Sequence, residues 1–198
     1  AAEAKGKLGL EQRPAALARL YTTMGRTDSM AKLKALAESP ALSPDARRKL
    51  LTVLIQTGTA AEAEYALKRE PNDPALADAW VASARLRPTL DYGSLVRAWV
   101  ARPEPFGQAT ACRVMAVAGK DYGALSRLEG WLASGTPTEV RLAALTAYAR
   151  LRKAESLPRL TPSLDDPDPT VRAVARAALA PYAAPIVAER SVAGLAEC

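Results

Sequence analysis

The chain has 198 residues, of which 49% are hydrophobic and 24% charged, and it carries a formal net charge of +6 without a single histidine. Without histidine the common zinc sites are excluded, and a serine or cysteine nucleophile has no imidazole base. There is also no CxxC spacing, no glycine-rich phosphate loop, and no apolar run of the roughly 18 residues that a membrane span needs. We therefore expect no enzyme, no catalytic residue, no metal site, no cofactor and no membrane span.

Prolines recur at intervals of 30 to 32 residues. They are Pro14, Pro44, Pro74, Pro105, Pro137 and Pro169. Proline is favoured at the first position of a helix, where its missing N–H costs nothing, and several of these follow a capping residue, such as Ser43 or Asp73. Each proline therefore predicts the start of a structural repeat.

Apolar residues keep fixed distances from these prolines. Six residues after them lie Leu20, Leu50, Trp80, Ala111, Ala143 and Ala175. Ten residues after them lie Met24, Leu54, Ala84, Met115, Ala147 and Leu179. The two columns share one face of a helix, so they predict a buried stripe on the first helix of every repeat.

A second amphipathic segment follows in each repeat. These segments cover residues 29–37, 60–69, 92–100, 122–133, roughly 154–164 and 185–195. Between the two helices stand Gly25, Gly58 and Gly119, which we expect in the left-handed conformation that ends many helices. The pattern predicts an all-α solenoid without β-sheet, forming a single domain over residues 1–198 with about six helix pairs and a flexible start over residues 1–10.

The last third of the chain carries a D-x-x-V-R-x-x-A pattern at Asp168, Val171, Arg172 and Ala175. Through this pattern, residues 137–180 resemble HEAT repeats of the short type also found in phycobilisome lyase subunits. The resemblance implies a right-handed α-α superhelix whose first helices face the convex side and whose second helices line the concave side. It also implies that a turn aspartate pairs with an arginine of a neighbouring repeat, with Arg141 and Arg172 as the partners.

Several clusters have an ordinary structural interpretation. The acidic group Asp165, Asp166 and Asp168 could bind a cation, but its place before a helix favours capping. The basic run at residues 47–49 is expected to be a solvated face of a first helix. Cys112 falls on an apolar stripe and should be an inert, buried thiol, whereas Cys198 is the last residue.

The three tryptophans differ in what their positions predict. Trp80 belongs to an apolar column and is expected in the core. Trp99 and Trp131 lie near the ends of second helices, where the sequence predicts burial and exposure equally.

A duplicated motif supplies the candidate binding residues. Asp-Tyr-Gly-Ser-Leu at residues 91–95 recurs as Asp-Tyr-Gly-Ala-Leu at 121–125, each followed by an arginine. Tyr92 with Arg97 and Tyr122 with Arg127 would then form a ladder on adjacent second helices, and both side-chain types are enriched in binding hot spots. The alternative is that the tyrosines pack between repeats and the arginines cover apolar surface with their stems.

Two functions follow from these features. The favoured one is a non-catalytic interaction module or scaffold that binds a protein or peptide partner, with an acidic partner matching the +6 charge. The alternative is a nucleic-acid-binding protein, including the HEAT-like DNA glycosylase type that the resemblance brings in. The composition fits a soluble protein, either cytoplasmic or exported after loss of an N-terminal segment, since the chain begins at Ala1 without methionine.

Overall fold

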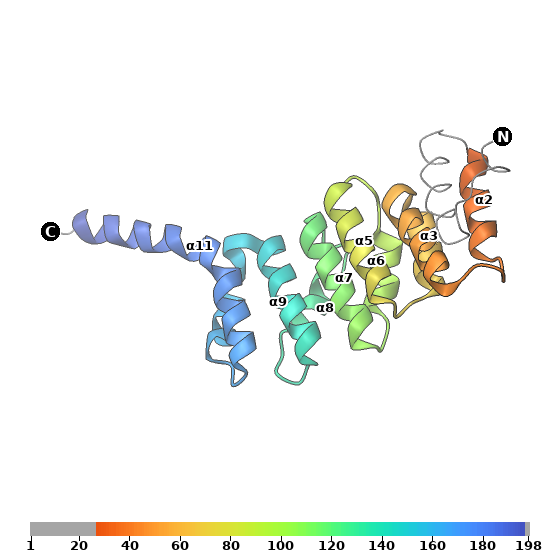
Figure 1. Ribbon diagram of the computed structural model, residues 1–198. Helices are drawn as coiled ribbons and strands as arrows, with labels where there is room; N and C mark the ends of the chain where they lie inside the picture. The colour runs from red at the N-terminus through yellow and green to blue at the C-terminus, as the bar shows by residue number, and fades with distance from the viewer. Residues whose placement is uncertain (1–26, 197–198) are drawn as a thin grey trace. The chain divides into compact units, whose positions relative to one another are not determined.

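The computed structural model describes the backbone of residues 27–196 and the side chains of residues 30–182 (Figure 1). All regular secondary structure in this range is helical. The described chain forms two compact units, residues 1–91 and residues 92–198. The repeat expected near Pro14, including Gly25, lies outside the described residues, as does Cys198.

Unit 1 contains the helices α2 (Thr27–Ala37), α3 (Pro44–Thr57), α4 (Ala60–Arg69) and α5 (Pro74–Leu86). Both proline-initiated helices begin at the predicted proline. The Ser43 hydroxyl accepts a hydrogen bond from the Ala46 N–H at 3.2 Å, and the Asp73 carboxylate accepts one from the Ala75 N–H at 2.8 Å. A side-chain cap followed by proline therefore starts each helix, as the sequence predicted.

Helix packing in unit 1 buries the predicted stripe. Helix α3 packs against α2, α4 and α5, and α4 also packs against α5. Leu50, Leu54, Trp80 and Ala84 from the two columns are fully buried. Each repeat thus covers the apolar face of its neighbour, which is the packing of a helical solenoid.

Gly58 differs from its predicted conformation. Its φ of −78° and ψ of −175° are extended, whereas Gly119 has the expected left-handed φ of 65°. Glycine is required at position 58 for another reason: a Cβ there would lie 2.5 Å from the Glu62 Cβ and 2.6 Å from the Leu54 carbonyl oxygen. Glycine is therefore required at position 58 because α4 approaches closely, and not because the turn is left-handed.

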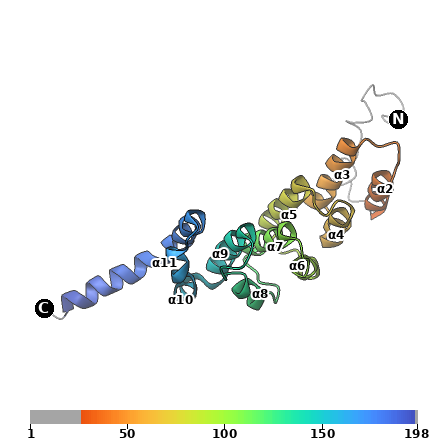
Figure 2. The same cartoon turned by 90° about the horizontal axis from the view of Figure 1, so that it is seen from below.

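Unit 2 begins with α6 (Gly93–Val100), α7 (Pro105–Ala118), α8 (Leu125–Gly130) and α9 (Thr138–Arg152). Three short turns follow, namely η1 (Lys153–Ser156), α10 (Leu157–Leu160) and η2 (Thr161–Asp165), and then the long α11 (Pro169–Ala196). Helix α7 packs along α9, and α9 along α11. The second elements α6, α8 and α10 lie on the other side of this row, against α7, α9 and α11 respectively (Figure 2).

Three of the predicted second helices of unit 2 were wrong in extent. The segment 122–133 starts late because Tyr122 and Gly123 both have positive φ, 51° and 78°, and the Asp121 carboxylate accepts the Gly123 N–H at 3.0 Å. The segment 154–164 is broken into η1, α10 and η2, because Pro158 and Pro162 lack the N–H that a continuous helix needs.

The last predicted pair is a single helix. Residues 185–195 do not form a separate second helix but continue α11 to Ala196. The helix runs through Pro181 and Pro185, each of which lacks the N–H of a regular helical turn, and the alanine-rich sequence around them has a high helix propensity.

The all-α, stacked-helix architecture confirms the predicted solenoid class. A single domain spanning the whole chain stays a prediction. No helix within the described residues combines the length and apolar character needed to cross a bilayer.

Candidate functional site

The two predicted arginines lie exposed on second elements of unit 2. Helix α6 buries Leu95, Val96, Trp99 and Val100, which leaves Arg97 on the opposite, solvent-facing side. Helix α8 likewise buries Leu128 and exposes Arg127. The amphipathic period of each short helix therefore turns its arginine outward.

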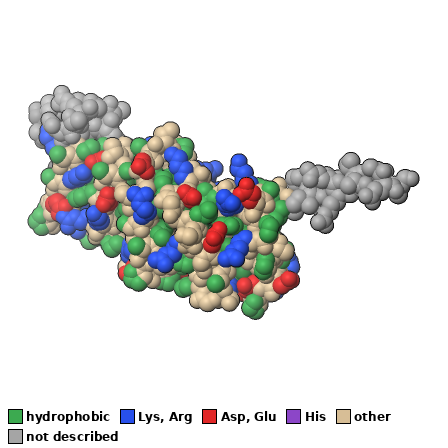
Figure 3. Space-filling model, turned by 180° about the vertical axis from the view of Figure 1, so that it is seen from behind, with side chains coloured by type: hydrophobic (Ala, Val, Ile, Leu, Met, Phe, Trp, Pro, Cys, Tyr) green, Lys and Arg blue, Asp and Glu red, His purple; other side chains and the backbone are tan. Residues whose placement is uncertain are grey.

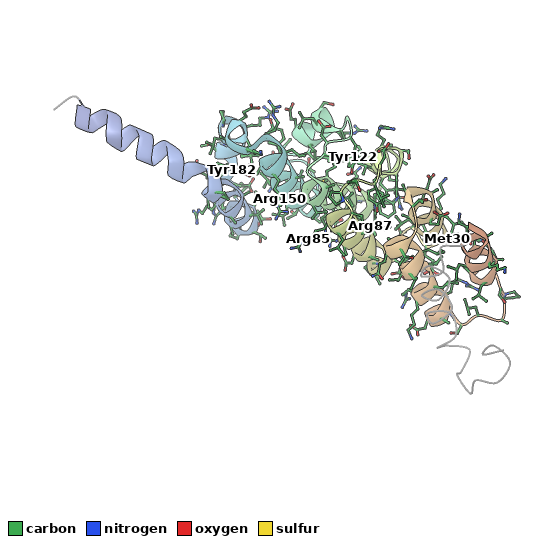
Figure 4. All side chains as sticks on the ribbon, turned by 90° about the horizontal axis from the view of Figure 1, so that it is seen from above. Met30, Arg85, Arg87, Tyr122, Arg150 and Tyr182 are labelled. Carbon is green, nitrogen blue, oxygen red and sulfur yellow. The ribbon has the colours of Figure 1, made fainter. Side chains whose placement is uncertain are left out.

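The two tyrosines are placed differently from the predicted ladder. Tyr92 is completely buried, so it contributes to the core and not to a contact surface. Tyr122 is half-buried in the turn before α8 (Figure 4). Burying a tyrosine ring removes a large apolar area from water, and this outweighs any advantage of exposure in the free protein.

A hydrogen bond nevertheless connects the two copies of the duplicated motif. The Nη1 atom of Arg97 donates to the Tyr122 carbonyl oxygen at 3.4 Å. This long hydrogen bond uses one of the five N–H donors of the guanidinium. The structure therefore brings Arg97 next to the turn that leads into the helix of Arg127.

A third arginine occupies the next equivalent place. Arg159 on α10 is exposed and stands 32 residues after Arg127, just as Arg127 stands 30 residues after Arg97. We call Arg97, Arg127 and Arg159 the arginine row. Arg159 was not among the predicted site residues because α10 lacks the duplicated motif, although extending the repeat interval by one step leads to it.

In the described part of unit 1, the second helix α4 carries no unpaired cation at the corresponding place. Leu67 of α4 is buried, and the neighbouring Lys68 forms an ion pair with Glu64 at 2.7 Å. In the described part of unit 2, by contrast, neither Arg127 nor Arg159 forms an ion pair. The row is thus a property of unit 2.

The carboxylates near the row are already engaged. Glu129 of α8 accepts a hydrogen bond from the Tyr148 hydroxyl at 3.1 Å, and Glu155 pairs with Arg152 at 2.8 Å. Burial raises the pKa of Tyr148, with a further increase from Glu129, while the positive charges of Arg152 and Arg159 oppose it. Arg159 therefore lies within electrostatic reach of the Tyr148 hydroxyl.

The basic run at residues 47–49 is not a merely solvated face. Arg47 is half-buried and donates to the carbonyl oxygens of Ala37 at 3.0 Å and Ser39 at 3.2 Å. Arg48 pairs with Asp73 at 2.6 Å. These arginines tie the turns of unit 1 together, so they are structural.

The three tryptophans belong to the core. Trp80 is fully buried as predicted, and Trp99 and Trp131 are buried with exposures of 5% and 9%. The guanidinium of Arg102 lies 4.7 Å from the centre of the Trp99 ring and covers it. None of the three indoles is available to stack on a nucleobase.

The acidic turn before α11 is a connection between repeats. Arg141 of α9, itself buried, donates to the Asp166 carboxylate at 2.9 Å. Arg172 donates to the Asp166 and Pro167 carbonyl oxygens at 2.6 and 3.0 Å. The Asp168 carboxylate caps α11 through the Thr170 N–H at 2.8 Å, and this bond lowers the pKa of Asp168. The predicted capping and the Arg141 pairing are confirmed, whereas Arg172 binds main-chain oxygens.

Cys112 is buried within α7, and burial raises the pKa of its thiol to about 12. A thiol with this pKa is almost wholly protonated at neutral pH, so it is inert, as predicted. Among the described residues no group of three or more Cys, Asp or Glu side chains is arranged to hold a metal ion.

Two shallow cavities open on unit 2. One of about 460 Å³ includes Lys120, Tyr122, Leu125 and Arg152 in its wall. The other, of about 360 Å³, lies between α9 and α11 and is lined mainly by alanine, valine and proline, with Arg150 and Tyr182 at its edge (Figure 4).

Comparison with known proteins gave one family. Residues 94–180, which make up most of unit 2, match the HEAT repeats. No curated protein and no solved structure matches the chain. The match and the stacked helix pairs of unit 2 together support a HEAT-repeat family for this region.

Proposed function

We propose that the chain is a non-catalytic interaction module that binds a protein partner through the arginine row of unit 2. HEAT repeats commonly mediate protein interactions, and the region matched to them contains all three arginines. The observation that carries the proposal is the placement of Arg97, Arg127 and Arg159, exposed on three successive second elements. Assignment of these repeats to the short phycobilisome-lyase type is part of the same proposal.

The chemistry of the row suits a macromolecular partner. Each guanidinium presents a planar fork of donors that pairs with a carboxylate in bidentate fashion. Arginine is also among the residues that most often dominate binding energy in protein interfaces. Repetition along a stack of helices spreads such contacts over an extended surface, which is how solenoid proteins bind.

The test begins with affinity capture by the intact chain, followed by purification of the captured protein and measurement of its Kd. The double variant R97A/R127A should weaken binding by about thirtyfold, since two hot-spot arginines together contribute at least about 2 kcal/mol. The matched control is R150A/R176A, which removes two exposed arginines from the first helices α9 and α11. Equal loss in both variants would show that net charge, and not the row, determines binding.

Nucleic acid is the competing partner for a basic protein. Figure 3 shows one face of the described residues, on which Lys and Arg side chains are interspersed with Asp and Glu. A duplex bound only through such a surface should bind weakly and lose affinity steeply as salt rises. Sub-micromolar duplex binding at physiological salt would overturn the proposal, and excision of a modified base would establish the glycosylase alternative.

A further inference from the structure

The cavity of about 460 Å³ on unit 2 combines positive charge with apolar surface. Its wall includes Lys120 and Tyr122 from the turn before α8, Leu125 at the start of α8, and Leu151 and Arg152 at the end of α9. The two cations are exposed, and the other three side chains are half-buried. Ligand pockets in proteins typically enclose about 300–1,000 Å³ and join apolar walls to a few polar or charged groups. The cavity therefore has the size and lining of a binding site.

Strained backbone occurs at the same cavity. Within the described residues, Tyr122 and Lys153 are the non-glycine residues with positive φ, at 51° and 52°. Tyr122 belongs to the cavity wall, and Lys153 directly follows the wall residue Arg152. Lys153 combines its φ with a ψ of −128°, a region that glycine normally occupies. Because strained backbone clusters at binding sites, where the surrounding structure enforces it, this coincidence supports a binding role for the cavity.

Positive charge exceeds negative charge around this cavity. Lys120 and Arg152 are the cations of the wall, and Asp121 is its carboxylate. Arg97 adds a third positive charge, because its Nη1 atom donates to the carbonyl oxygen of the wall residue Tyr122 at 3.4 Å. The excess of positive charge favours an anionic group on the ligand.

The carboxylates of Asp121 and Glu155 are engaged differently. The Asp121 carboxylate accepts the Gly123 N–H at 3.0 Å and so holds the turn before α8. Glu155 pairs with Arg152 at 2.8 Å, but the side chains of this pair are 69% and 42% exposed. Such an exposed ion pair contributes little free energy, so a ligand carboxylate can displace Glu155 from Arg152.

We propose that this cavity binds a short segment of a protein partner in which an apolar side chain stands next to a carboxylate. The apolar side chain packs on Leu125 and Leu151, and the carboxylate pairs with Lys120 or Arg152. Because the cavity is shallow, it suits side chains presented by a macromolecule better than an enclosed small molecule. This inference rests on the proposed function in taking a protein as the partner, and it adds a contact site with its own ligand chemistry.

The experiment uses the isotopically labelled full chain and three Gly-Ser peptides that differ only in their central residues, which are Glu-Leu-Glu, Gln-Leu-Gln or Glu-Ser-Glu. Nuclear magnetic resonance titration at physiological salt gives Kd and shows which residues respond. The variants are K120Q, R152Q, L125A and E155Q. The matched control is R150Q, which removes the same charge from the same helix but at a residue in the wall of the other cavity. Far-ultraviolet circular dichroism confirms that each variant is folded.

We expect the Glu-Leu-Glu peptide to bind about fivefold or more tightly than either of the other two, since each of them lacks one of the two contacts. Shift changes should concentrate in residues 119–125 and 151–153. K120Q and R152Q should each weaken this peptide by about two- to fivefold, as expected for an exposed ion pair, and L125A by a similar factor. E155Q should strengthen binding because it removes the competing carboxylate, and R150Q should leave Kd unchanged.

Equal binding of the three peptides, shift changes that lie elsewhere, or equal weakening by R150Q and R152Q would overturn the inference. An oligonucleotide that produces the same shift changes at a lower concentration than the Glu-Leu-Glu peptide would also overturn it. The captured partner tests the function separately. If R97A/R127A weakens that partner while the Glu-Leu-Glu peptide does not bind in the cavity, the proposed function stands and this inference falls; if the peptide binds there while R97A/R127A leaves capture unchanged, the arginine row fails and this inference stands.

Discussion

Replacing Asp166 by alanine should destabilise unit 2 more than any other single change in its connecting turns. Asp166, in the turn before α11, and Arg141 of α9 form an ion pair, and their side chains are only 11% and 6% exposed. The substitution leaves the Arg141 guanidinium buried without its counter-charge. It also removes the acceptor for the Asp168 N–H, which the Asp166 carboxylate binds at 2.9 Å.

The expected loss is about 3 kcal/mol of unfolding free energy. Removing one partner of a buried ion pair typically costs about 3–5 kcal/mol, and a lost main-chain hydrogen bond about 1 kcal/mol. We take the lower end because Arg141 retains a long hydrogen bond to the Ser134 carbonyl oxygen at 3.4 Å. The control D165A removes an exposed carboxylate from the same turn and should cost less than about 0.5 kcal/mol.

Urea denaturation measures the loss, and amide hydrogen exchange shows where it falls. Exchange should accelerate in α9 and α11, whereas the amides of unit 1 should be unaffected, because solenoid repeats depend on their neighbours. The double variant R141M/D166L should recover much of the lost stability, since it removes both charges. A loss below 1 kcal/mol for D166A, or faster exchange throughout both units, would refute the reasoning.

Three further predictions concern other parts of the fold. Burial alone would raise the pKa of Glu62, but hydrogen bonds from Lys34 and Thr59 lower this pKa to about 2. The ionised Glu62 therefore stabilises the fold fully above pH 4.5, and this contribution is lost as the pH falls through 2. The unfolding free energy of E62Q should accordingly fall less steeply with decreasing pH than that of the native chain, and equal slopes would contradict this. G58A should cost about 1–3 kcal/mol in urea denaturation through its close contacts, whereas G130A, with open space at its Cβ, should be neutral or stabilising. In a C198S background the Cys112 thiol should react with a thiol reagent only after denaturation, and rapid labelling of the native protein would show that it is accessible.

The sequence determined well the features that depend on local chemistry, namely the helix starts and the buried helix faces. Pro44, Pro74 and Pro105 each begin a helix, because proline at a helix start depends only on its own ring and on the preceding residue. Within the described residues the apolar columns were likewise confirmed as buried stripes except at Ala143, which is half-buried, since the helical period decides which side chains share a face. These signals need no knowledge of neighbouring repeats.

The candidate site depended on contacts that the sequence does not reveal. Tyr92 and Tyr122 occupy equivalent places in the duplicated motif, yet Tyr92 is wholly buried and Tyr122 lies half-buried in a left-handed turn. The sequence predicted Arg47 on a solvated face, whereas in the structure its guanidinium donates to main-chain oxygens of the preceding turn.

Tertiary structure also decided which charges remain available. Arg141 and Arg159 are both arginines of the same repeat, but Arg141 is buried against Asp166 while Arg159 is exposed on α10. The difference arises because burial of a charge requires a counter-charge, and only the folded chain brings Asp166 from the turn before α11 to Arg141. The sequence thus determined where the helices begin and which faces they bury, and the packing of successive repeats decided which arginines are buried and which are exposed.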